Sequence, residues 1–365
     1  MVASELYTDV ELAVQDTARR YCQERLLPRV LGEYMRPQGV CSSANGLFCY
    51  VYVDAYRNEE YDRNILSEMG ELGFLGANIQ GYDCAGVSTV AYGLITKEVE
   101  RVDSGYRSGF SVQSSLAMTA IHEFGTPELK DRLLPQLAKG KLVGCFGLTE
   151  PDHGSDPGSM ETVARKHPTR EGYYLLSGTK TWITNSPIAD VLIVWAKVEG
   201  TIRGFAVERD RCPAGTLETP PLKNKTALRA SITGMIQLDE CPVPVENMFP
   251  DVEGLKGPFT CLNSARLGIS FGATGALEDC LSRARAYALE RKQFKGKPLA
   301  KYQLVQKKLA DAATHAAYGT LAATQVARLK DAGKASPEMI SMVKRQNADM
   351  ALEDARRFAQ SPLPC

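Results

Sequence analysis

The spacing of the apolar residues changes twice along the 365-residue chain, and this change most limits the folds that the chain can adopt. Up to about residue 141 the apolar residues recur at helical spacing, as in 11–29 and 65–75. Short runs rich in β-branched and aromatic residues follow, and helical spacing then returns. The sequence therefore predicts an α+β fold with an N-terminal helical domain (1–141), a central antiparallel β domain (142–257) and a C-terminal helical domain (258–365).

Five short segments are the expected strands of the central domain. Gly, Pro, Asn and Asp residues separate them, as is usual between the strands of a sandwich or barrel. Between the first two segments, Ser177-Gly178-Thr179 has the composition of a hairpin turn. The expected strands cover residues 173–176, 180–184, 191–198, 203–208 and 234–238.

The expected helices of the C-terminal domain are long and have recognisable ends. Gly333 is expected to end one helix, and Ser336 followed by Pro337 to begin the next, because Ser caps a first turn and Pro fits into it. Thr126 and Pro127 predict a similar start in the N-terminal domain. Long helices need partners to bury their apolar faces, which predicts a bundle. The expected helices cover 273–291, 302–332 and 336–360.

Composition argues against several classes of protein. The 43 basic and 43 acidic side chains balance to a net charge of zero, which argues against a nucleic-acid-binding surface. The densest apolar run, 47–53, is too short to span a membrane. Glu5, Asp9 and Glu11 make the N-terminus unlike a transit peptide, and the C-terminal sequence LPC is not a peroxisomal signal.

The Cys and His residues predict neither disulfides nor a metal centre. The ten Cys contain no Cys-x-x-Cys spacing, so we expect buried thiols in a reducing compartment. The four His form no metal-binding pattern. His153, between Asp152 and Asp156, fits a polar loop better than a metal site.

Two motifs in the central domain carry the strongest chemical signal. In the first, FGLTEP at 146–151, an expected strand leads into a loop that contains Gly154-Ser155-Asp156. Backbone N–H groups and hydroxyls in such a loop suit a phosphate or a ring system that gains negative charge, although a plain turn between strands has the same composition. The second motif, KTWITN at 180–185, places Trp182 between hydroxyl residues, where it is suited to flank a flat ligand.

In this order and at this distance, the two motifs resemble those of the acyl-CoA dehydrogenase family. Segments 98–108, 259–266 and 291–294 resemble its glutaryl-CoA dehydrogenase branch, and the resemblance covers most of the chain except 31–53 and the last few residues. It implies FAD bound between the β domain and the C-terminal bundle, and an acyl-CoA substrate. It also implies electron-transfer flavoprotein as the electron acceptor, a homotetramer, and the mitochondrial matrix as the location.

The resemblance also assigns roles to the residues that match the family motifs. Phe146 to Ser155, with Thr149 as a hydrogen-bond donor, would line the flavin ring, and Trp182 with its two successors would flank it. Arg291, Phe294 and Gln303 would reach the diphosphate and adenosine of FAD across a subunit interface. The predicted FAD residues are Phe146, Leu148, Thr149, Ser155, Trp182, Ile183, Thr184, Arg291, Phe294 and Gln303; the predicted acyl-CoA residues are Glu100, Arg107, Ser108, Ser155, Phe259, Leu262, Asn263 and Arg266.

The assignment to the glutaryl-CoA branch depends chiefly on Arg107. Glutaryl-CoA ends in a carboxylate, and an Arg in the acyl pocket, with Ser108 as a second donor, gives that carboxylate a charge-assisted partner. An unbranched monocarboxylic acyl chain would leave a buried Arg unpaired, which is costly. Glu100 is placed to orient the guanidinium; the alternative is that Glu100 and Arg107 form a routine ion pair at the surface or at a helix end.

The chain departs from the family pattern in two places. The family's catalytic Glu lies in a Tyr-Glu-Gly-Thr type motif after a Gly-Gly-x-Gly type segment, and neither occurs before Cys365. We therefore predict an incomplete C-terminal domain with no catalytic base, since that Glu would lie beyond the C-terminus. Residues 31–53 interrupt two helical patterns; we interpret them, with 361–365, as products of an incorrect gene model, and a genuine surface-loop insertion is the alternative.

The expected function is flavin-dependent oxidative decarboxylation of glutaryl-CoA to crotonyl-CoA and CO2, in lysine and tryptophan degradation, impaired by the loss of the base. Two alternatives stay open. One is an acyl-CoA dehydrogenase or oxidase that acts on another short-chain acyl-CoA. The other is a truncated, non-catalytic subunit that only binds nucleotide or co-assembles with a complete subunit.

Overall fold

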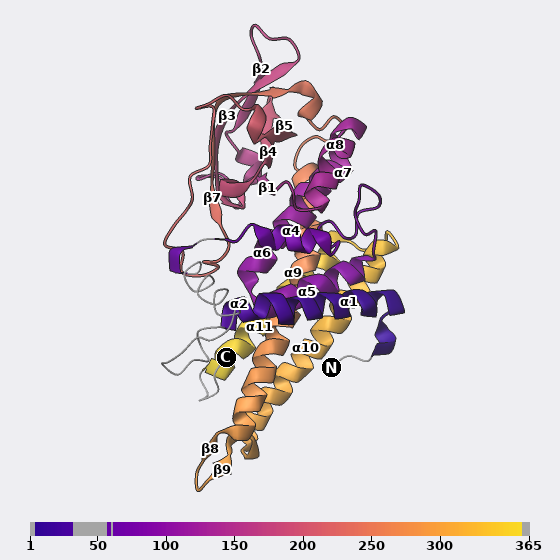
Figure 1. Ribbon diagram of the computed structural model, residues 1–365, viewed down its shortest axis with the longest axis vertical. Helices are drawn as coiled ribbons and strands as arrows, with labels where there is room; N and C mark the ends of the chain where they lie inside the picture. Colours follow the sequence, from indigo (N-terminus) through magenta and orange to yellow (C-terminus); the bar gives the residue numbers. More distant parts are fainter. Residues whose placement is uncertain (1–3, 32–56, 60, 360–365) are drawn as a thin grey trace, which may run out of the picture. The chain divides into compact units, whose positions relative to one another are not determined.

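The computed structural model of the chain describes residues 4–31, 57–59 and 61–359 (Figure 1). Internal contacts group the chain into two compact units. The first, which we name the helical unit, consists of Met1–Val30, Ser88–Arg107 and Arg266–Cys365. The second, the sheet unit, consists of Leu31–Val87 and Ser108–Ala265. The predicted insertion at 31–53, apart from the backbone of Leu31, and the predicted aberrant end at 361–365 lie outside the described residues, and the predicted domain boundaries stay predictions.

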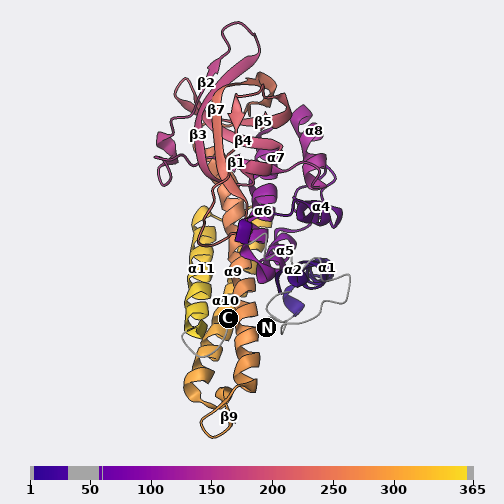
Figure 2. The same ribbon diagram turned by 60° about the vertical axis from the view of Figure 1, so that its left-hand side comes forward.

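The helical unit contains the N-terminal helices, one internal helix and the long C-terminal helices, of which α10 and α11 run alongside α9 in Figure 2. Two short strands form a hairpin before α10. The elements are η1 (Ser4–Leu6), α1 (Asp9–Tyr21), the π-helical turn η2 (Cys22–Leu26), α2 (Leu27–Leu31), α5 (Thr89–Val102), α9 (Lys256–Glu290, in this unit from Arg266), β8 (Lys292–Gln293), β9 (Lys297–Pro298), η8 (Leu299–Lys301), α10 (Gln303–Asp331) and α11 (Pro337–Ala359).

The predicted helix ends of this unit are confirmed at two places. Gly333 follows α10 with a φ of 66°, which glycine adopts without strain. The Ser336 hydroxyl accepts a hydrogen bond from the N–H of Met339 at 3.4 Å, at the start of α11. The predicted start of the next helix at residue 273 is too late, since α9 begins at Lys256. Its first turns lack a clear apolar stripe, so the periodicity argument missed them.

Four helices of the helical unit share one apolar core. Val90 and Leu94 of α5 pack with Leu267 and Phe271 of α9, and residues of α10 and Ile340 of α11 complete the cluster. Polar groups also join the helices. The side-chain amide of the buried Asn347 on α11 donates to two backbone oxygens, one on α9 and one on α10, each at 3.0 Å.

Buried carboxylates tie α1 and α5 to the same bundle. Glu98 on α5 is fully buried and accepts hydrogen bonds from Gln15 and Arg19 of α1, both at 3.1 Å. Glu11 accepts from Ser88 at 2.6 Å and pairs with Arg328 of α10. Although burial alone raises the pKa of Glu11, the hydrogen bonds from Arg328 and Ser88 lower it to about 2.

The sheet unit combines a mixed sheet with short helices. The strands are β1 (Gly144–Gly147), β2 (Val163–Lys166), β3 (Tyr173–Thr184), β4 (Val191–Val198), β5 (Thr201–Glu208), β6 (Leu217–Glu218) and β7 (Thr233–Pro244). The helices are α4 (Asn64–Glu71), α6 (Ser104–Ser111, in this unit from Ser108), the π-helical η3 (Val112–Met118), α7 (Thr119–Phe124) and α8 (Pro127–Ala138), with short turns η4 (Pro157–Ser159), η5 (Ser186–Ile188), η6 (Arg209–Arg211) and η7 (Val245–Asn247).

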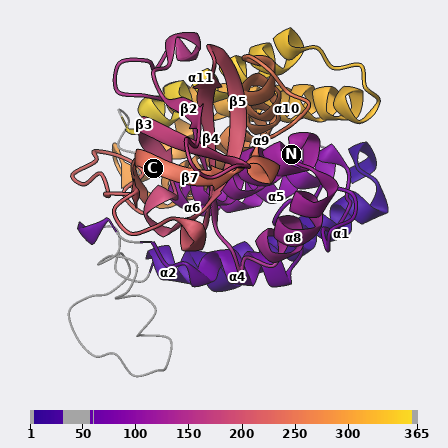
Figure 3. The same cartoon turned by 90° about the horizontal axis from the view of Figure 1, so that it is seen from above.

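The strands are hydrogen-bonded in the order β1-β4-β2-β3-β7-β6, and β5 pairs with β4. Most pairs are antiparallel, such as β3 with β7. Figure 3 shows the labelled strands of this unit from above. The prediction of a purely antiparallel domain is wrong in detail, because β4 pairs in parallel with both β1 and β2. The inward side chains of the strands form one apolar cluster that includes Leu176, Phe205 and Ile236.

The predicted hairpin at Ser177-Gly178-Thr179 is wrong. Strand β3 runs without a break from Tyr173 to Thr184, and the register with β7 shifts between Leu176 and Gly178. Gly178 has a φ of 145°, and a Cβ there would lie 2.5 Å from the hydroxyl oxygen of Thr162. Gly178 therefore lies in a bulge within a continuous strand, where only glycine fits. It does not mark a turn between two strands.

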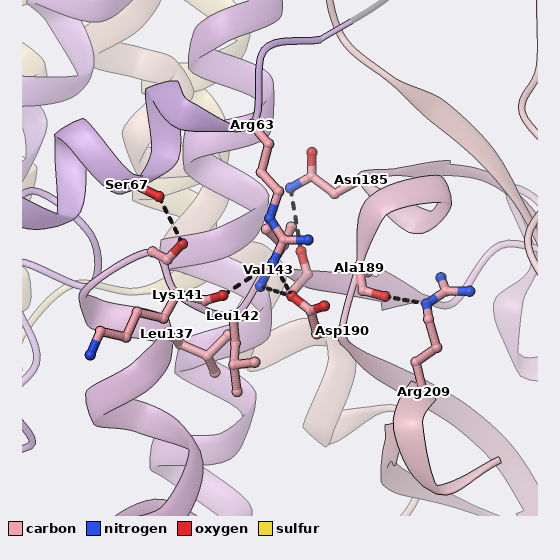
Figure 4. Close-up of polar contacts among 12 residues, drawn as sticks. Arg63, Ser67, Leu137, Lys141, Leu142, Val143, Asn185, Ala189, Asp190 and Arg209 are labelled. Carbon is pink, nitrogen blue, oxygen red and sulfur yellow. Dashed lines mark hydrogen bonds and ion pairs between the residues drawn. The ribbon is translucent and has the colours of Figure 1, made fainter.

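The start of β1 is fixed by a polar junction between strands and helices (Figure 4). The Asp190 carboxylate accepts the guanidinium N–H of Arg63 at 2.5 Å and the backbone N–H of Val143 at 2.8 Å. The Asn185 amide donates to the backbone oxygens of Gly109 and Gly144 at 3.1 and 3.3 Å.

The predicted cap at Thr126 is confirmed on α8, where its hydroxyl accepts from the N–H of Leu129 at 3.2 Å.

Within the described residues, no helix is long and apolar enough to cross a membrane. The described cysteines are free thiols, and Cys22, Cys145, Cys241 and Cys261 are buried.

Close packing of α9 on α5 predicts opposite effects for two substitutions in α9. A Cβ at Gly275 would lie 2.2 Å from the backbone oxygen of Lys97, whereas a Cβ at Gly268 meets its nearest side-chain atom at 3.6 Å. Gly275→Ala should lower the free energy of unfolding by about 1–3 kcal/mol, because the helices must move apart. Gly268→Ala should raise it by up to about 1 kcal/mol, because Ala favours helix. Urea unfolding of both variants measures the difference; equal effects would contradict the packing.

Candidate functional site

The first motif forms the end of β1 and the loop that follows. Phe146 and Leu148 are buried, and Thr149 is half-buried. The loop then turns back on itself, since the N–H of Glu150 donates to the His153 oxygen at 3.4 Å and the N–H of His153 donates to the Glu150 oxygen at 3.2 Å. Ser155 is exposed beyond this turn.

The second motif forms the end of β3, where the strand is irregular. The register with β7 shifts between Lys180 and Ile183, and Trp182 lies in this bulge with a φ of 59°. The left-handed region is unfavourable for a bulky side chain, and such outliers are concentrated at functional sites. The bulge exposes 63% of Trp182 while Ile183 is buried and Thr184 is half-buried.

Hydrogen bonds join the two motifs into one surface. The N–H of Thr181 donates to the Thr149 oxygen at 2.9 Å, and the Lys180 ammonium donates to the Leu148 oxygen at 3.2 Å. The structure therefore brings together the predicted FAD residues of the sheet unit, from Phe146 to Thr149 and from Trp182 to Thr184. We name this the motif surface. An exposed indole beside half-buried hydroxyls fits a flat ring system.

Beneath the motif surface lies a buried ion pair that the sequence reasoning missed. The Lys180 side chain is fully buried, and its ammonium lies 2.7 Å from the Glu150 carboxylate. Burial lowers the pKa of Lys180 to about 8, although the bond to Glu150 opposes this. Burial raises the pKa of Glu150, but the N–H of Glu161, Lys180 and the Thr162 hydroxyl outweigh it and lower the pKa to about 2. In the sequence, a Lys and a Glu thirty positions apart carry no signal that they pair.

In the helical unit, Arg107 lies near the start of α6, and Asp103 caps that helix. The Asp103 carboxylate accepts the N–H groups of Gly105 and Tyr106 at 2.7 and 3.1 Å. The Arg107 Nε–H pairs with the Glu100 carboxylate, whose other oxygen accepts the Ser104 hydroxyl at 2.5 Å. The side chains of Arg107 and Glu100 are only 15% and 9% exposed, so this ion pair between the end of α5 and the start of α6 is largely withdrawn from solvent.

The three residues predicted to reach the far end of FAD lie in or beside the β8–β9 hairpin. Arg291 and Gln303 are exposed. Phe294 is 69% exposed at a φ of 45°, and its ring packs edge-on against Tyr302 with centroids 5.1 Å apart. An exposed aromatic ring on a left-handed backbone is a feature that this hairpin shares with the motif surface.

The remaining predicted acyl-CoA residues lie on α9 and α6. Phe259 is exposed on the first turns of α9, and Leu262, Asn263 and Arg266 are half-buried further along it. Ser108 is half-buried on α6. The roles of all predicted site residues stay predictions. Among the described residues, no group of His, Cys, Asp and Glu is arranged to hold a metal ion.

Comparison with known proteins identifies the family. Models of the acyl-CoA dehydrogenase N-terminal, middle and C-terminal domains match residues 50–141, 145–241 and 253–361. A curated glutaryl-CoA dehydrogenase from Desulfococcus multivorans is 32% identical over 319 residues, which cover 84% of this chain and 80% of that protein. The chain belongs to the acyl-CoA dehydrogenase family. The predicted family and its fold of helical, β and helical domains are therefore confirmed.

Other acyl-CoA dehydrogenases show how far the similarity extends. A glutaryl-CoA dehydrogenase from Mycobacterium smegmatis, solved in complex with FADH2, is 40% identical, with a TM-score of 0.87 over 97% of this chain and 84% of that one. A short-chain-specific acyl-CoA dehydrogenase from Megasphaera elsdenii is 32% identical over 302 residues, which cover 80% of this chain and 77% of that protein. These neighbours support the predicted resemblance to the glutaryl-CoA branch.

The backbone at Trp182 predicts a gain of stability when the indole is removed. Asn tolerates the left-handed region far better than Trp, and the exposed indole contributes little packing. Trp182→Asn should therefore raise the free energy of unfolding of the flavin-free protein by about 1 kcal/mol. Trp182→Phe keeps a bulky side chain at the same φ and should leave it nearly unchanged. Urea unfolding of both variants provides the test, and a loss of stability in Trp182→Asn would refute the strain.

Proposed function

We propose that this chain binds FAD and catalyses the oxidative decarboxylation of glutaryl-CoA to crotonyl-CoA and CO2. Its family accounts for the flavin-dependent dehydrogenation of an acyl-CoA thioester. The choice of a dicarboxylic substrate depends on one observation, the environment of Arg107. We also propose that electron-transfer flavoprotein accepts the electrons, that the chain forms a homotetramer, and that it is located in the mitochondrial matrix.

The motif surface fits FAD, the cofactor of the family. The M. smegmatis relative was solved with FADH2, and the similarity to it covers 97% of this chain. In this chain, Thr149 and Thr184 supply half-buried hydroxyls to the surface, and Trp182 supplies an exposed ring. Bound there, FAD would supply the acceptor for the hydride that leaves Cβ of the substrate. The chain supplies the position of the ring, the exclusion of water and the binding of the substrate.

The geometry of Arg107 fits a substrate carboxylate. Glu100 engages the Nε side of the guanidinium, so the planar group is held in orientation. Within the described part of the helical unit, the two terminal nitrogens of Arg107 have no hydrogen-bond partner. Those nitrogens form the face that binds a carboxylate through two parallel hydrogen bonds. A short monocarboxylic acyl group would offer this face no acceptor.

The fixed orientation of the Arg107 guanidinium also suits decarboxylation. An Arg that holds the terminal carboxylate fixes the distal end of the chain while the thioester is held at the other end, so that Cα and Cβ lie at a defined place. The carboxylate must then leave as CO2, and a pair already shared with Glu100 binds it less tightly than an isolated Arg would. Arg107 therefore selects the substrate and is compatible with release of the product.

Removal of the guanidinium should separate the two classes of substrate. Arg107→Gln should raise the dissociation constant for glutaryl-CoA about 10- to 100-fold, because hydrogen bonds to a charged group contribute about 1.5–3 kcal/mol. The dissociation constant for butyryl-CoA should stay the same or fall. Arg107→Lys, which keeps the charge but not the planar fork, should give an intermediate loss for glutaryl-CoA. Titration of the FAD-loaded protein with each thioester measures these effects, and equal losses for both would exclude the proposed role.

Proton abstraction from Cα requires a base, and the printed sequence contains no Tyr-Glu-Gly-Thr segment. A protein made of these 365 residues should therefore bind glutaryl-CoA but reduce its flavin about 10²- to 10⁴-fold more slowly than a version extended by the family's C-terminal segment. Anaerobic stopped-flow absorbance compares the two. Equal rates would show that a residue within this sequence acts as the base.

A further inference from the structure

We propose that Lys180 is a positioning residue for the flavin: its buried pair with Glu150 fixes the backbone of Leu148 and Thr149 and the bulge that exposes Trp182. The inference rests on the proposed binding of FAD to the motif surface. Lys180 does not itself belong to that surface, because its side chain is fully buried beneath it.

The first step is that the ammonium of Lys180, in the second motif, makes two hydrogen bonds to the first motif. Its ammonium donates to the Glu150 carboxylate at 2.7 Å and to the Leu148 oxygen at 3.2 Å, and lies 3.8 Å from the sulfur of Met160. The next residue in β3, Thr181, holds the Thr149 oxygen. Two consecutive carbonyls of the first motif are therefore held by two consecutive residues of the second. This fixes the direction in which the Thr149 side chain and the following peptide can point.

The second step is that Glu150 closes the network from the opposite side. One carboxylate oxygen accepts the N–H and hydroxyl of Thr162, at 3.0 and 2.5 Å, besides the ammonium. The other oxygen accepts the N–H of Glu161 at 2.6 Å. Hydrogen bonds therefore hold the loop of the first motif on both sides, from Lys180 and from residues 161 and 162. A buried pair with all of its hydrogen bonds made specifies one arrangement, whereas loss of one partner leaves an unpaired charge.

The third step concerns the strain that the network must oppose. Trp182 follows Lys180 by two residues and has a left-handed backbone that a bulky residue avoids. A strained backbone persists only where its surroundings hold it. Ile183 is buried on one side of the bulge and Lys180 on the other, so the exposed Trp182 is held between two buried anchors. Without the Lys180 anchor, we expect the strand to relax and the indole to lose its fixed position.

Lys97 offers a matched control for this role. It is also a buried lysine, 2.8 Å from the carboxylate of Glu278, but it lies in the helical unit and not on β3. Lys180→Met and Lys97→Met therefore both remove a buried ammonium from a carboxylate, and both should destabilise the protein, although Glu278 keeps its ion pair with Arg101 at 2.6 Å. Only Lys180→Met should change the flavin site.

The experiment measures the dissociation constant of FAD, by recovery of flavin fluorescence, for the full chain and both variants at a temperature where all three are folded. We expect Lys180→Met to weaken FAD binding at least tenfold and to alter the visible circular dichroism of the bound flavin. Lys97→Met should stay within twofold. Equal FAD affinity for Lys180→Met and the unmodified chain overturns the inference alone, whereas no FAD binding by the unmodified chain overturns the proposed function as well.

If Lys180→Met does not fold, two milder substitutions at Thr162 test the same positioning role. Thr162→Val removes only the hydroxyl bond to Glu150, and Thr162→Ser keeps it. We expect Thr162→Val to weaken FAD binding by at least threefold and Thr162→Ser to restore it. Identical FAD affinities for these two variants would contradict the positioning role.

Discussion

The pairing of Lys180 with Glu150 is the interaction on which the motif surface depends. It places an ammonium and a carboxylate where neither is exposed, which is costly unless every hydrogen bond is made. Here the available partners are backbone groups of the first motif and of residues 161 and 162. The charges are therefore stable only if the loop adopts this conformation. Burial of one ion pair converts two short sequence motifs into a single surface.

The helical unit shows the same principle with a different outcome. Glu98, Glu11 and Glu278 are engaged by Arg or Lys side chains from neighbouring helices, so their charges serve packing. At Arg107, Glu100 takes one edge of the guanidinium, and we propose that the other edge binds the substrate carboxylate. On this proposal, a structural ion pair differs from a recognition site in the number of donors that the protein leaves unused.

The sequence predicted the helical and β zones because local periodicity and capping residues determine them, as at Thr126, Ser336 and Gly333. It failed where distant contacts decide. Gly178 looked like a turn residue, but its neighbour Thr162 requires a glycine within a continuous strand. Nothing in the sequence indicated that Lys180 is buried, because a Lys is rarely buried and its partner is thirty positions away. The motifs indicated candidate site residues, whereas the left-handed backbone of Trp182 could be seen only in the structure.

The central claim is that the chain is a flavin-dependent dehydrogenase whose acyl pocket binds a terminal carboxylate of the substrate. Competition between glutaryl-CoA and butyryl-CoA for the FAD-loaded, unmodified protein tests it most directly, with the flavin absorbance as the signal. The account predicts that glutaryl-CoA displaces butyryl-CoA and binds at least tenfold more tightly. Tighter binding of butyryl-CoA would contradict it and assign the chain to the short-chain enzymes of the same family.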